Sequence, residues 1–244
     1  AATTLVLAAA VHRARTLLYR TATEETAAAD LTKFVGKDAA ARIRASDAGL
    51  RAGDGELRRA AIMMIDLRGF TAATKGAPPA EVIGLLQDYQ SRIVPIIESG
   101  GGSIDKFLGD GVLVSFGAAR DTGAECAEAV RTALAVAEAA DRWKEARARA
   151  GQQTLDIGIA IATGDVVFGA VGHGDRLEFT VIGDAVNLAA KLEKYTKIER
   201  CRIIATADVL ERAASQGHPP PPARRIASAV VEGAPGTLDL VAIG

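Results

Sequence analysis

Two aspartates occupy positions where metal-assisted chemistry on a phosphate would need acidic ligands. Asp66 follows the continuous apolar run at 60–65, a pattern typical of a buried strand. Asp110 stands between two glycines, a turn signal that separates two short predicted strands. If the first strand lies beside this hairpin in one sheet, both carboxylates meet at one edge. Such a pair suits Mg²⁺, which takes its other ligands from water and substrate phosphates, although Asp is also common in turns for structural reasons alone.

The composition is that of a globular protein without a strong charge bias. Of the 244 residues, 49% are hydrophobic and 24% are charged, which excludes a mainly disordered chain. The formal net charge of −1 argues against nucleic acid as a partner, because holding a phosphate backbone needs a basic excess. Cys126 and Cys201 are far apart and fit no metal, redox or disulfide pattern, so we expect a cytoplasmic location.

Residues 1–58 are expected to form a helix and linker ahead of the main domain at 59–244. Residues 1–11 are mostly apolar but too few to cross a bilayer, which takes about 20 residues. Basic residues follow, and two interpretations stay open. The segment is either the trimmed end of a membrane helix, with a tether upstream of residue 1 and the domain on the cytoplasmic face, or an Ala-rich surface helix or processed terminus. An apolar stripe within 11–35 predicts a connecting helix, which pairs with the same helix of a second copy or packs on its own domain.

The order of elements in the main domain predicts an α+β fold with a ferredoxin-like βαββαβ core. Apolar runs indicate the strands, and two long helices are expected to begin at the capping residues Asp121 and Asp184. C-terminal strand and helix additions follow the core. The expected elements are strands at 60–65, 103–108, 112–116 and 155–162, helices at 79–99, 121–150 and 184–196, a hairpin at 166–171 and 177–182, and shorter elements to the end.

Three segments of the main domain resemble motifs of one enzyme family. They read IDLRGFT at 65–71, DKFLGDG at 105–111 and FTVIGDAVNLAAKLE at 179–193. In this order and spacing they resemble the catalytic domain of class III nucleotidyl cyclases, and the resemblance covers about residues 59–243.

The resemblance implies a metal and triphosphate site around the acidic pair. Asp66 and Asp110 would hold two Mg²⁺ or Mn²⁺ ions, with a further ligand from the backbone of Leu67. Backbone amides at Arg68, Gly69, Phe70 and Thr71, entering a helix, would contact the triphosphate, as such turns favour anions.

Lys106 and Thr180 fall at the positions that read the purine in the family. Adenine presents an acceptor at N1 and a donor at its 6-amino group. Lys only donates and a Thr hydroxyl can accept, so the pair matches adenine. Guanine, with a donor at N1 and an acceptor at O6, would be matched better by an acidic residue plus a donor. Within the family, this Lys–Thr pair resembles the purine-reading pair of the bacterial members.

Asn187 and Lys191 lie four residues apart and would project from one helix face. By resemblance, Asn187 would orient the ribose. Lys191 would stabilise charge on the reacting phosphates, where the family usually has Arg. Lys keeps the charge but loses the planar fork of Arg. Near the C-terminus, Glu232 stands where the family often carries a Lys that reaches the terminal phosphate.

The function implied is that of an adenylate cyclase, which forms 3′,5′-cyclic AMP and pyrophosphate from ATP. The ribose 3′-hydroxyl would attack the α-phosphate with the help of two metal ions. The sites would be shared across a head-to-tail homodimer, with the aspartates from one chain and the remaining residues from the other. The alternative is a weak or inactive homologue that acts as a nucleotide-binding or dimerising regulatory module. Guanylate cyclase, diguanylate cyclase and a polymerase palm explain the motifs less well.

Overall fold

The computed structural model describes residues 53–173 and 176–244. The connecting helix predicted within 11–35 and most of the predicted linker lie outside these described residues. In the part of the chain that is described, no helix is both long enough and apolar enough to cross a membrane.

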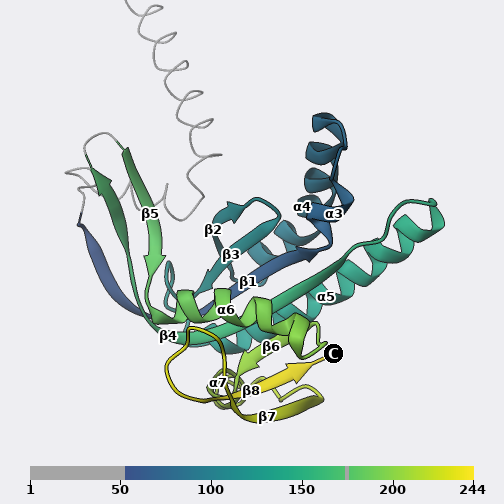
Figure 1. Ribbon diagram of the computed structural model, residues 1–244. Coiled ribbons are helices and arrows are strands. Elements are labelled where there is room, and N and C mark those ends of the chain that lie inside the picture. The colour runs from purple at the N-terminus through teal and green to yellow at the C-terminus, as the bar shows by residue number, and fades with distance from the viewer. Residues whose placement is uncertain (1–52, 174–175) are drawn as a thin grey trace, which may run out of the picture. The chain divides into compact units, whose positions relative to one another are not determined.

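An eight-stranded sheet forms the centre of the domain (Figure 1). Strand β1 lies between β3 and β4 and is antiparallel to both, while β2 pairs with the far edge of β3. Together with α4 and α5 this arrangement is the predicted ferredoxin-like βαββαβ core, which is confirmed. The core elements are β1 (Gly55–Arg68), α4 (Pro79–Ser99), β2 (Ser103–Leu108), β3 (Gly111–Phe116), α5 (Glu125–Arg149) and β4 (Asp156–His173).

Both faces of β1 are buried over residues 60–65, which explains the continuous apolar run there. Ala61, Met63 and Ile65 pack on one face in the hydrophobic cluster that includes side chains of α4 and α5. Ile62 and Met64 point to the other face and pack with side chains of α6. A strand covered on both sides has no polar face, so its sequence does not alternate. The strand end that carries Asp66 is therefore held between two apolar layers.

The C-terminal additions extend the sheet and cover its second face. Strand β5 forms a hairpin with β4, and α6 packs across β4 and β1. Strand β6 is parallel to β4, and β8 and β7 follow it to the edge. In Figure 1 the β4–β5 hairpin extends beyond the other strands. The added elements are β5 (Arg176–Ile182), α6 (Asp184–Ile198), β6 (Ile203–Thr206), α7 (Ala207–Ser215), β7 (Ala223–Ala229) and β8 (Leu238–Ile243).

Strand β1 begins at Gly55, earlier than the predicted domain start at Arg59. Residues 55–58, expected to belong to the linker, pair instead with residues 166–169 of β4. Their polar composition concealed the strand, because its partner lies more than 100 residues away.

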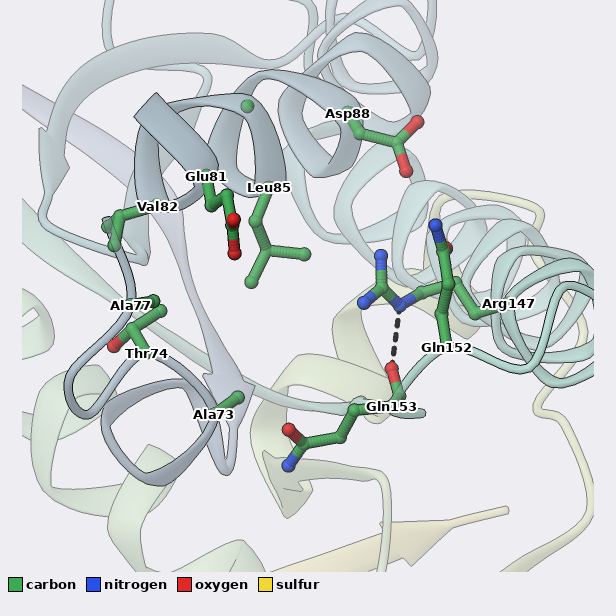
Figure 2. A pocket seen from close by; sticks show the side chains of 11 residues that line it. Ala73, Thr74, Ala77, Glu81, Val82, Leu85, Asp88, Arg147, Gln152 and Gln153 are labelled. Carbon is green, nitrogen blue, oxygen red and sulfur yellow. Dashed lines mark hydrogen bonds between the residues drawn. The ribbon is translucent and has the colours of Figure 1, made fainter. Parts of the chain in front are cut away.

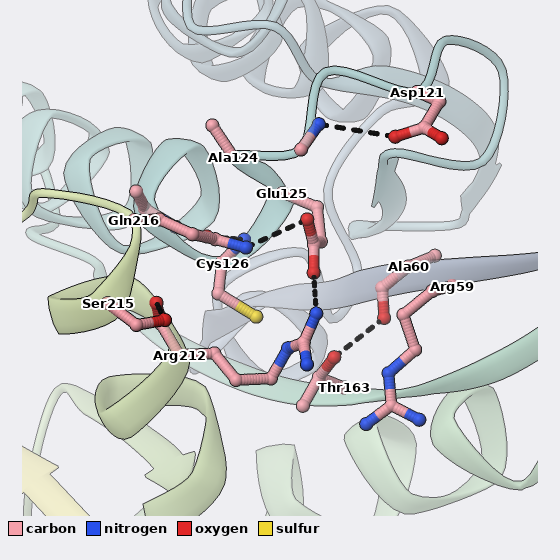
Figure 3. A network of polar contacts seen from close by, with 12 residues as sticks. Arg59, Ala60, Asp121, Ala124, Glu125, Cys126, Thr163, Arg212, Ser215 and Gln216 are labelled. Atoms are coloured by element: carbon pink, nitrogen blue, oxygen red, sulfur yellow. Dashed lines mark hydrogen bonds and ion pairs between the residues drawn. The ribbon is translucent and has the colours of Figure 1, made fainter.

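Helix α5 is not capped by Asp121, contrary to the sequence-based prediction. The helix begins at Glu125, and Asp121 accepts a hydrogen bond from Gly123 in the preceding loop. The cap comes from Gln216, whose side-chain oxygen accepts hydrogen bonds from the N–H groups of Cys126 at 3.0 Å and Ala127 at 2.9 Å. Figure 3 shows Gln216 and Arg212, from the end of α7, converging on Glu125. A distant side chain thus satisfies the free N–H groups of a helix start.

Candidate active site

The two predicted metal ligands lie together at one end of β1. The turn between β2 and β3 packs so closely on this end that a Cβ added at Gly111 would lie 3.5 Å from the Ile65 carbonyl oxygen. Asp110 in this turn therefore faces Asp66. Burial, and then repulsion by Asp66, raise the pKa of the Asp110 carboxyl, and hydrogen bonds from the N–H groups of Asp110 and Leu67 only partly oppose the rise. The two carboxylates therefore lie close together, as the sequence leads us to expect.

A tyrosine lies close to this acidic pair with its polar atom unused. Tyr89 of α4 is 1% exposed, and its hydroxyl has no hydrogen-bond partner among the described residues. Burial, and then the charges of Asp66 and Asp110, raise the pKa of this hydroxyl. A neutral buried hydroxyl beside two carboxylates is suited to a hydrated cation, whose bound water would donate a hydrogen bond to the phenolic oxygen.

The donor set fits a magnesium-type ion rather than a closed metal cage. Within residues 53–173 and 176–244, no three His, Cys, Asp or Glu side chains gather in a way that could hold a metal. Two carboxylates with a backbone carbonyl leave several coordination positions for water and phosphate, which is the arrangement Mg²⁺ prefers. Asp66 and Asp110 are the residues that would hold such ions.

A lysine that the sequence reasoning missed contacts one of the predicted metal ligands. The Nζ atom of Lys197, near the end of α6, lies 3.2 Å from Oδ2 of Asp66 and 3.6 Å from Oε1 of Glu193. Glu193 is buried, and burial followed by the charge of Asp66 raises its pKa, while Lys197 and Arg68 oppose the rise. The only sequence signal was the i,i+4 spacing of Glu193 and Lys197, which is ordinary on a helix surface.

The segment predicted to contact the triphosphate forms a sharp turn after β1. Gly69 has φ +83°, a left-handed conformation that favours glycine, and helix α3 (Phe70–Ala73) follows at once. The first N–H groups of a helix have no partner inside it, so those of Phe70 and Thr71 are placed at the turn beside Asp66. The side chain of Arg68 is directed elsewhere and donates to the Cys201 carbonyl at 2.6 Å.

The predicted purine-reading residues are brought together by an aspartate between them. Thr180 of β5 donates its hydroxyl hydrogen to Oδ2 of Asp105 at 2.8 Å, and Val181 N–H donates to Oδ1 at 3.1 Å. The Lys106 ammonium lies 3.5 Å from Asp105 Oδ2 and also pairs with Glu178. Asp105 has a side chain only 4% exposed. It stands inside the second motif, but no signal in the sequence placed its carboxylate against β5.

Asn187 and Lys191 lie one turn apart on α6, as predicted. Asn187 is exposed, and the Lys191 ammonium donates to the backbone carbonyl of Gly233 in the loop between β7 and β8. This loop also carries Glu232, which is exposed. Glu232 is therefore the sequence neighbour of the residue whose carbonyl accepts from the predicted phosphate-contacting lysine.

The predicted residues form three groups rather than one enclosed site. They are the acidic pair with its turn, the Lys106–Thr180 pair, and the two residues on α6. No hydrogen bond or ion pair between described residues joins Lys106, Thr180, Asn187 or Lys191 to the acidic pair. A pocket of about 530 Å³ lies between α4 and the end of α5, where Arg147 Nε donates to the Gln153 carbonyl at 2.7 Å (Figure 2). None of the predicted site residues lines this pocket.

Comparison with known proteins identifies relatives over most of the described domain. The family model for the adenylate and guanylate cyclase catalytic domain matches residues 55–218. An adenylate cyclase of Anabaena cylindrica is 34% identical over 165 residues, which are 66% of this chain and 32% of that protein. The chain spans about a third of the length of the first curated relatives it matches.

Solved structures show the same fold. The guanylyl cyclase Cya2 is 30% identical with a TM-score of 0.65, and the match covers 77% of this chain and 92% of that one. The adenylyl cyclase CyaB from P. aeruginosa shares the fold, with a TM-score of 0.70 at 24% identity over 78% of this chain and 96% of that one. Because the family model covers more than half of the chain and the structural similarity extends over the same domain, this chain belongs to the family of adenylate and guanylate cyclase catalytic domains.

Proposed function

We propose that the chain is an adenylate cyclase that converts ATP into 3′,5′-cyclic AMP and pyrophosphate at sites shared across a head-to-tail homodimer. The observation that carries the choice of ATP is the hydrogen bond from Thr180 to Asp105. Two Mg²⁺ or Mn²⁺ ions held by Asp66, Asp110 and the Leu67 carbonyl would lower the pKa of the ribose 3′-hydroxyl and neutralise charge on the phosphates.

Asp105 fixes which way Thr180 can hydrogen-bond to a base. A hydroxyl has one hydrogen, and Thr180 gives it to Asp105. Its remaining lone pairs can only accept, as the 6-amino group of adenine requires, whereas O6 of guanine would meet an acceptor. Lys106 adds a donor for N1 of adenine. Because Thr180 is 8% exposed, a mismatch there would leave a polar atom unsatisfied away from water.

The remaining residues would bind the sugar and phosphates. Asn187 would hold the ribose so that its 3′-oxygen faces the α-phosphate. Lys191 would exchange the Gly233 carbonyl for a phosphate oxygen, and the N–H groups of Phe70 and Thr71 would bind the triphosphate. These are orientation and charge roles, and they require no nucleophile from the protein.

An exposed apolar row supports the dimer. Leu57 of β1 pairs with Val167 of β4, and Val167 pairs with Ile182 of β5, so the three side chains point to one face. Their exposed fractions are 72%, 45% and 48%. Ile182 is two residues from Thr180, which lies on the same face of β5. A second copy covering this row would bury exposed apolar surface beside the predicted purine-reading pair.

The test of the activity is cyclic nucleotide formation from ATP and from GTP, with Mn²⁺ or Mg²⁺, over a range of protein concentrations. We expect cyclic AMP from ATP, with specific activity that rises with protein concentration. Asp110→Ala should lower the activity about 100-fold or more. Cyclic GMP as the main product would favour guanylate cyclase, which the similarity to Cya2 makes the second candidate. Silence with both nucleotides in a folded dimer would favour the regulatory module.

Mixing two inactive variants tests whether the site is shared. Asp66→Asn removes a metal ligand, and Asn187→Ala removes the ribose contact. After subunit exchange, half of the dimers contain one chain of each kind, and each of these has one intact site, so about a quarter of the wild-type activity should return. If one chain supplied both residues to the same site, mixing would restore nothing.

A further inference from the structure

We propose that Lys197 is a two-position counterion of the metal site, pairing with Asp66 in the metal-free protein and moving to Glu193 when a divalent cation binds at Asp66. This inference rests on the proposed metal-binding role of Asp66. It makes Lys197 and Glu193 positioning residues that tune metal affinity.

The first position is the one in the structure. Lys197 Nζ is within hydrogen-bond distance of Asp66 Oδ2, at 3.2 Å. An ammonium there neutralises one carboxylate of a pair that otherwise repels itself. It also stands where a divalent cation on Asp66 would be repelled by a like charge. Lys197 must therefore give way before the cation binds.

The second position is an acceptor that is already buried and unsatisfied. The Glu193 side chain is 8% exposed, and its Oε1 has no hydrogen-bond partner among the described residues. Lys197 Nζ lies 3.6 Å from this atom, just beyond hydrogen-bond distance. A desolvated carboxylate oxygen without a partner is costly, and a closer ammonium would relieve that cost.

The space left by Gly158, below Glu193, keeps the Glu193 carboxylate within reach of Lys197 on α6. Gly158 of β4 lies directly opposite Asp66 in the sheet. A Cβ at Gly158 would lie 3.2 Å from Glu193 Oε1 and 2.9 Å from Thr196 Oγ1. The missing side chain leaves room for Glu193 to remain beside Asp66 instead of being displaced toward solvent.

The movement needs no change of the backbone. Both acceptors are within 3.6 Å of the same ammonium, and the Lys197 side chain is 52% exposed. Rotation about the last bonds of a half-exposed lysine is fast and easy. A cation on Asp66 and an ammonium on Glu193 would each have a carboxylate, and Glu193 Oε1 would no longer be unpaired.

The test is titration of the 244-residue chain with Mn²⁺ in the absence of nucleotide, with free Mn²⁺ followed by electron paramagnetic resonance. The variants are Lys197→Met and Glu193→Gln, separately and together. Lys194→Met is the matched control, because Lys194 is exposed on the same helix and makes no ion pair with any described residue. Asp66→Asn identifies the binding that belongs to this site.

Lys197→Met should bind Mn²⁺ about two- to fivefold more tightly, the range expected when a partly exposed ion pair no longer competes. Glu193→Gln should bind about two- to fivefold more weakly while Lys197 is present, because the ammonium has lost its second position. In the Lys197→Met background, Glu193→Gln should have less than half of that effect on a logarithmic scale. Such non-additivity is the signature of a switch.

Three results would count against the proposal or its premise. Equal effects of Glu193→Gln in both backgrounds would reduce Lys197 to a background charge and overturn the switch. Equal affinities of Lys197→Met and Lys194→Met would do the same, and neither result would affect the proposed cyclase activity. Mn²⁺ binding that survives Asp66→Asn unchanged would instead remove the metal site, and with it both this inference and the proposed function.

Discussion

Asp105→Asn should weaken the discrimination between ATP and GTP without unfolding the protein. Asp105 holds Val181 N–H with Oδ1 and the Thr180 hydroxyl with Oδ2. Asn is isosteric, and its single oxygen would stay on the Val181 N–H. Its amide group would then face Thr180 as a donor, so the Thr180 hydroxyl would have to accept from it and would be free to donate to a base.

The size of the effect follows from one reversed hydrogen bond at a nearly buried position. Leaving a buried polar atom unsatisfied costs about 1–3 kcal/mol. Since about 1.4 kcal/mol is a factor of ten, the ratio of kcat/KM for ATP over GTP should fall roughly 5- to 150-fold. The assay is cyclic nucleotide formation from each substrate with Mn²⁺, with folding checked by circular dichroism.

Glu178→Gln is the matched control for this experiment. Asp105→Asn also removes a negative charge from beside Lys106, and Glu178 is the other carboxylate on that lysine. Glu178→Gln therefore changes the surroundings of Lys106 but leaves Thr180 untouched. The reasoning is refuted if folded Asp105→Asn keeps the wild-type substrate ratio, or if Glu178→Gln lowers the ratio equally.

Two further predictions concern stability. Gln216→Ala should lower the free energy of unfolding in urea by about 1–2 kcal/mol, because it removes the cap of α5. Gln152→Ala, in the exposed segment just after that helix, should change the free energy of unfolding by less than about 0.5 kcal/mol. Asp156→Asn should cost about 0.5–1 kcal/mol at pH 7, since the partly exposed carboxylate pairs with Lys144 and Arg202. Partial burial raises the pKa of Asp156, but Lys144, a backbone N–H and Arg202 outweigh this effect and hold the pKa below its usual range. The difference in unfolding free energy between wild type and variant should therefore vanish as the pH falls through this lowered pKa.

The core and the acidic pair could be predicted because their signals are local. The apolar run at 60–65 reflects a strand covered on both faces, and the glycines around Asp110 mark a tight turn. Once the βαββαβ order is recognised, the strand containing Asp66 must lie beside that hairpin, so the convergence of the carboxylates follows from topology.

The residues that support the site could not be predicted because their partners are remote. Asp105 meets Thr180 across 75 residues of sequence, and Lys197 meets Asp66 across 131. Asp105 reads as an ordinary charge beside Lys106, and nothing in its neighbourhood indicates a buried carboxylate. The cap of α5 was mistaken for the same reason, since an aspartate ahead of a helix is the usual local signal and Gln216 is not.

The cationic side chains around the predicted nucleotide and metal sites are held in the free chain by contacts that a nucleotide or a metal ion can replace at low cost. Lys106 pairs with the exposed Glu178, Lys191 donates to a loop carbonyl, and Lys197 occupies Asp66. Partly exposed ion pairs of this kind contribute only about 0–1 kcal/mol each. Each long cationic side chain is thereby kept near its working position, which reduces the ordering cost of binding. The Thr180–Asp105 hydrogen bond differs, because it is nearly buried and need not break. In the proposed function, the hydrogen-bond direction of Thr180 toward the base would therefore rest on a rigid contact, whereas Lys106 and the groups for phosphate and metal would be released from exchangeable ones.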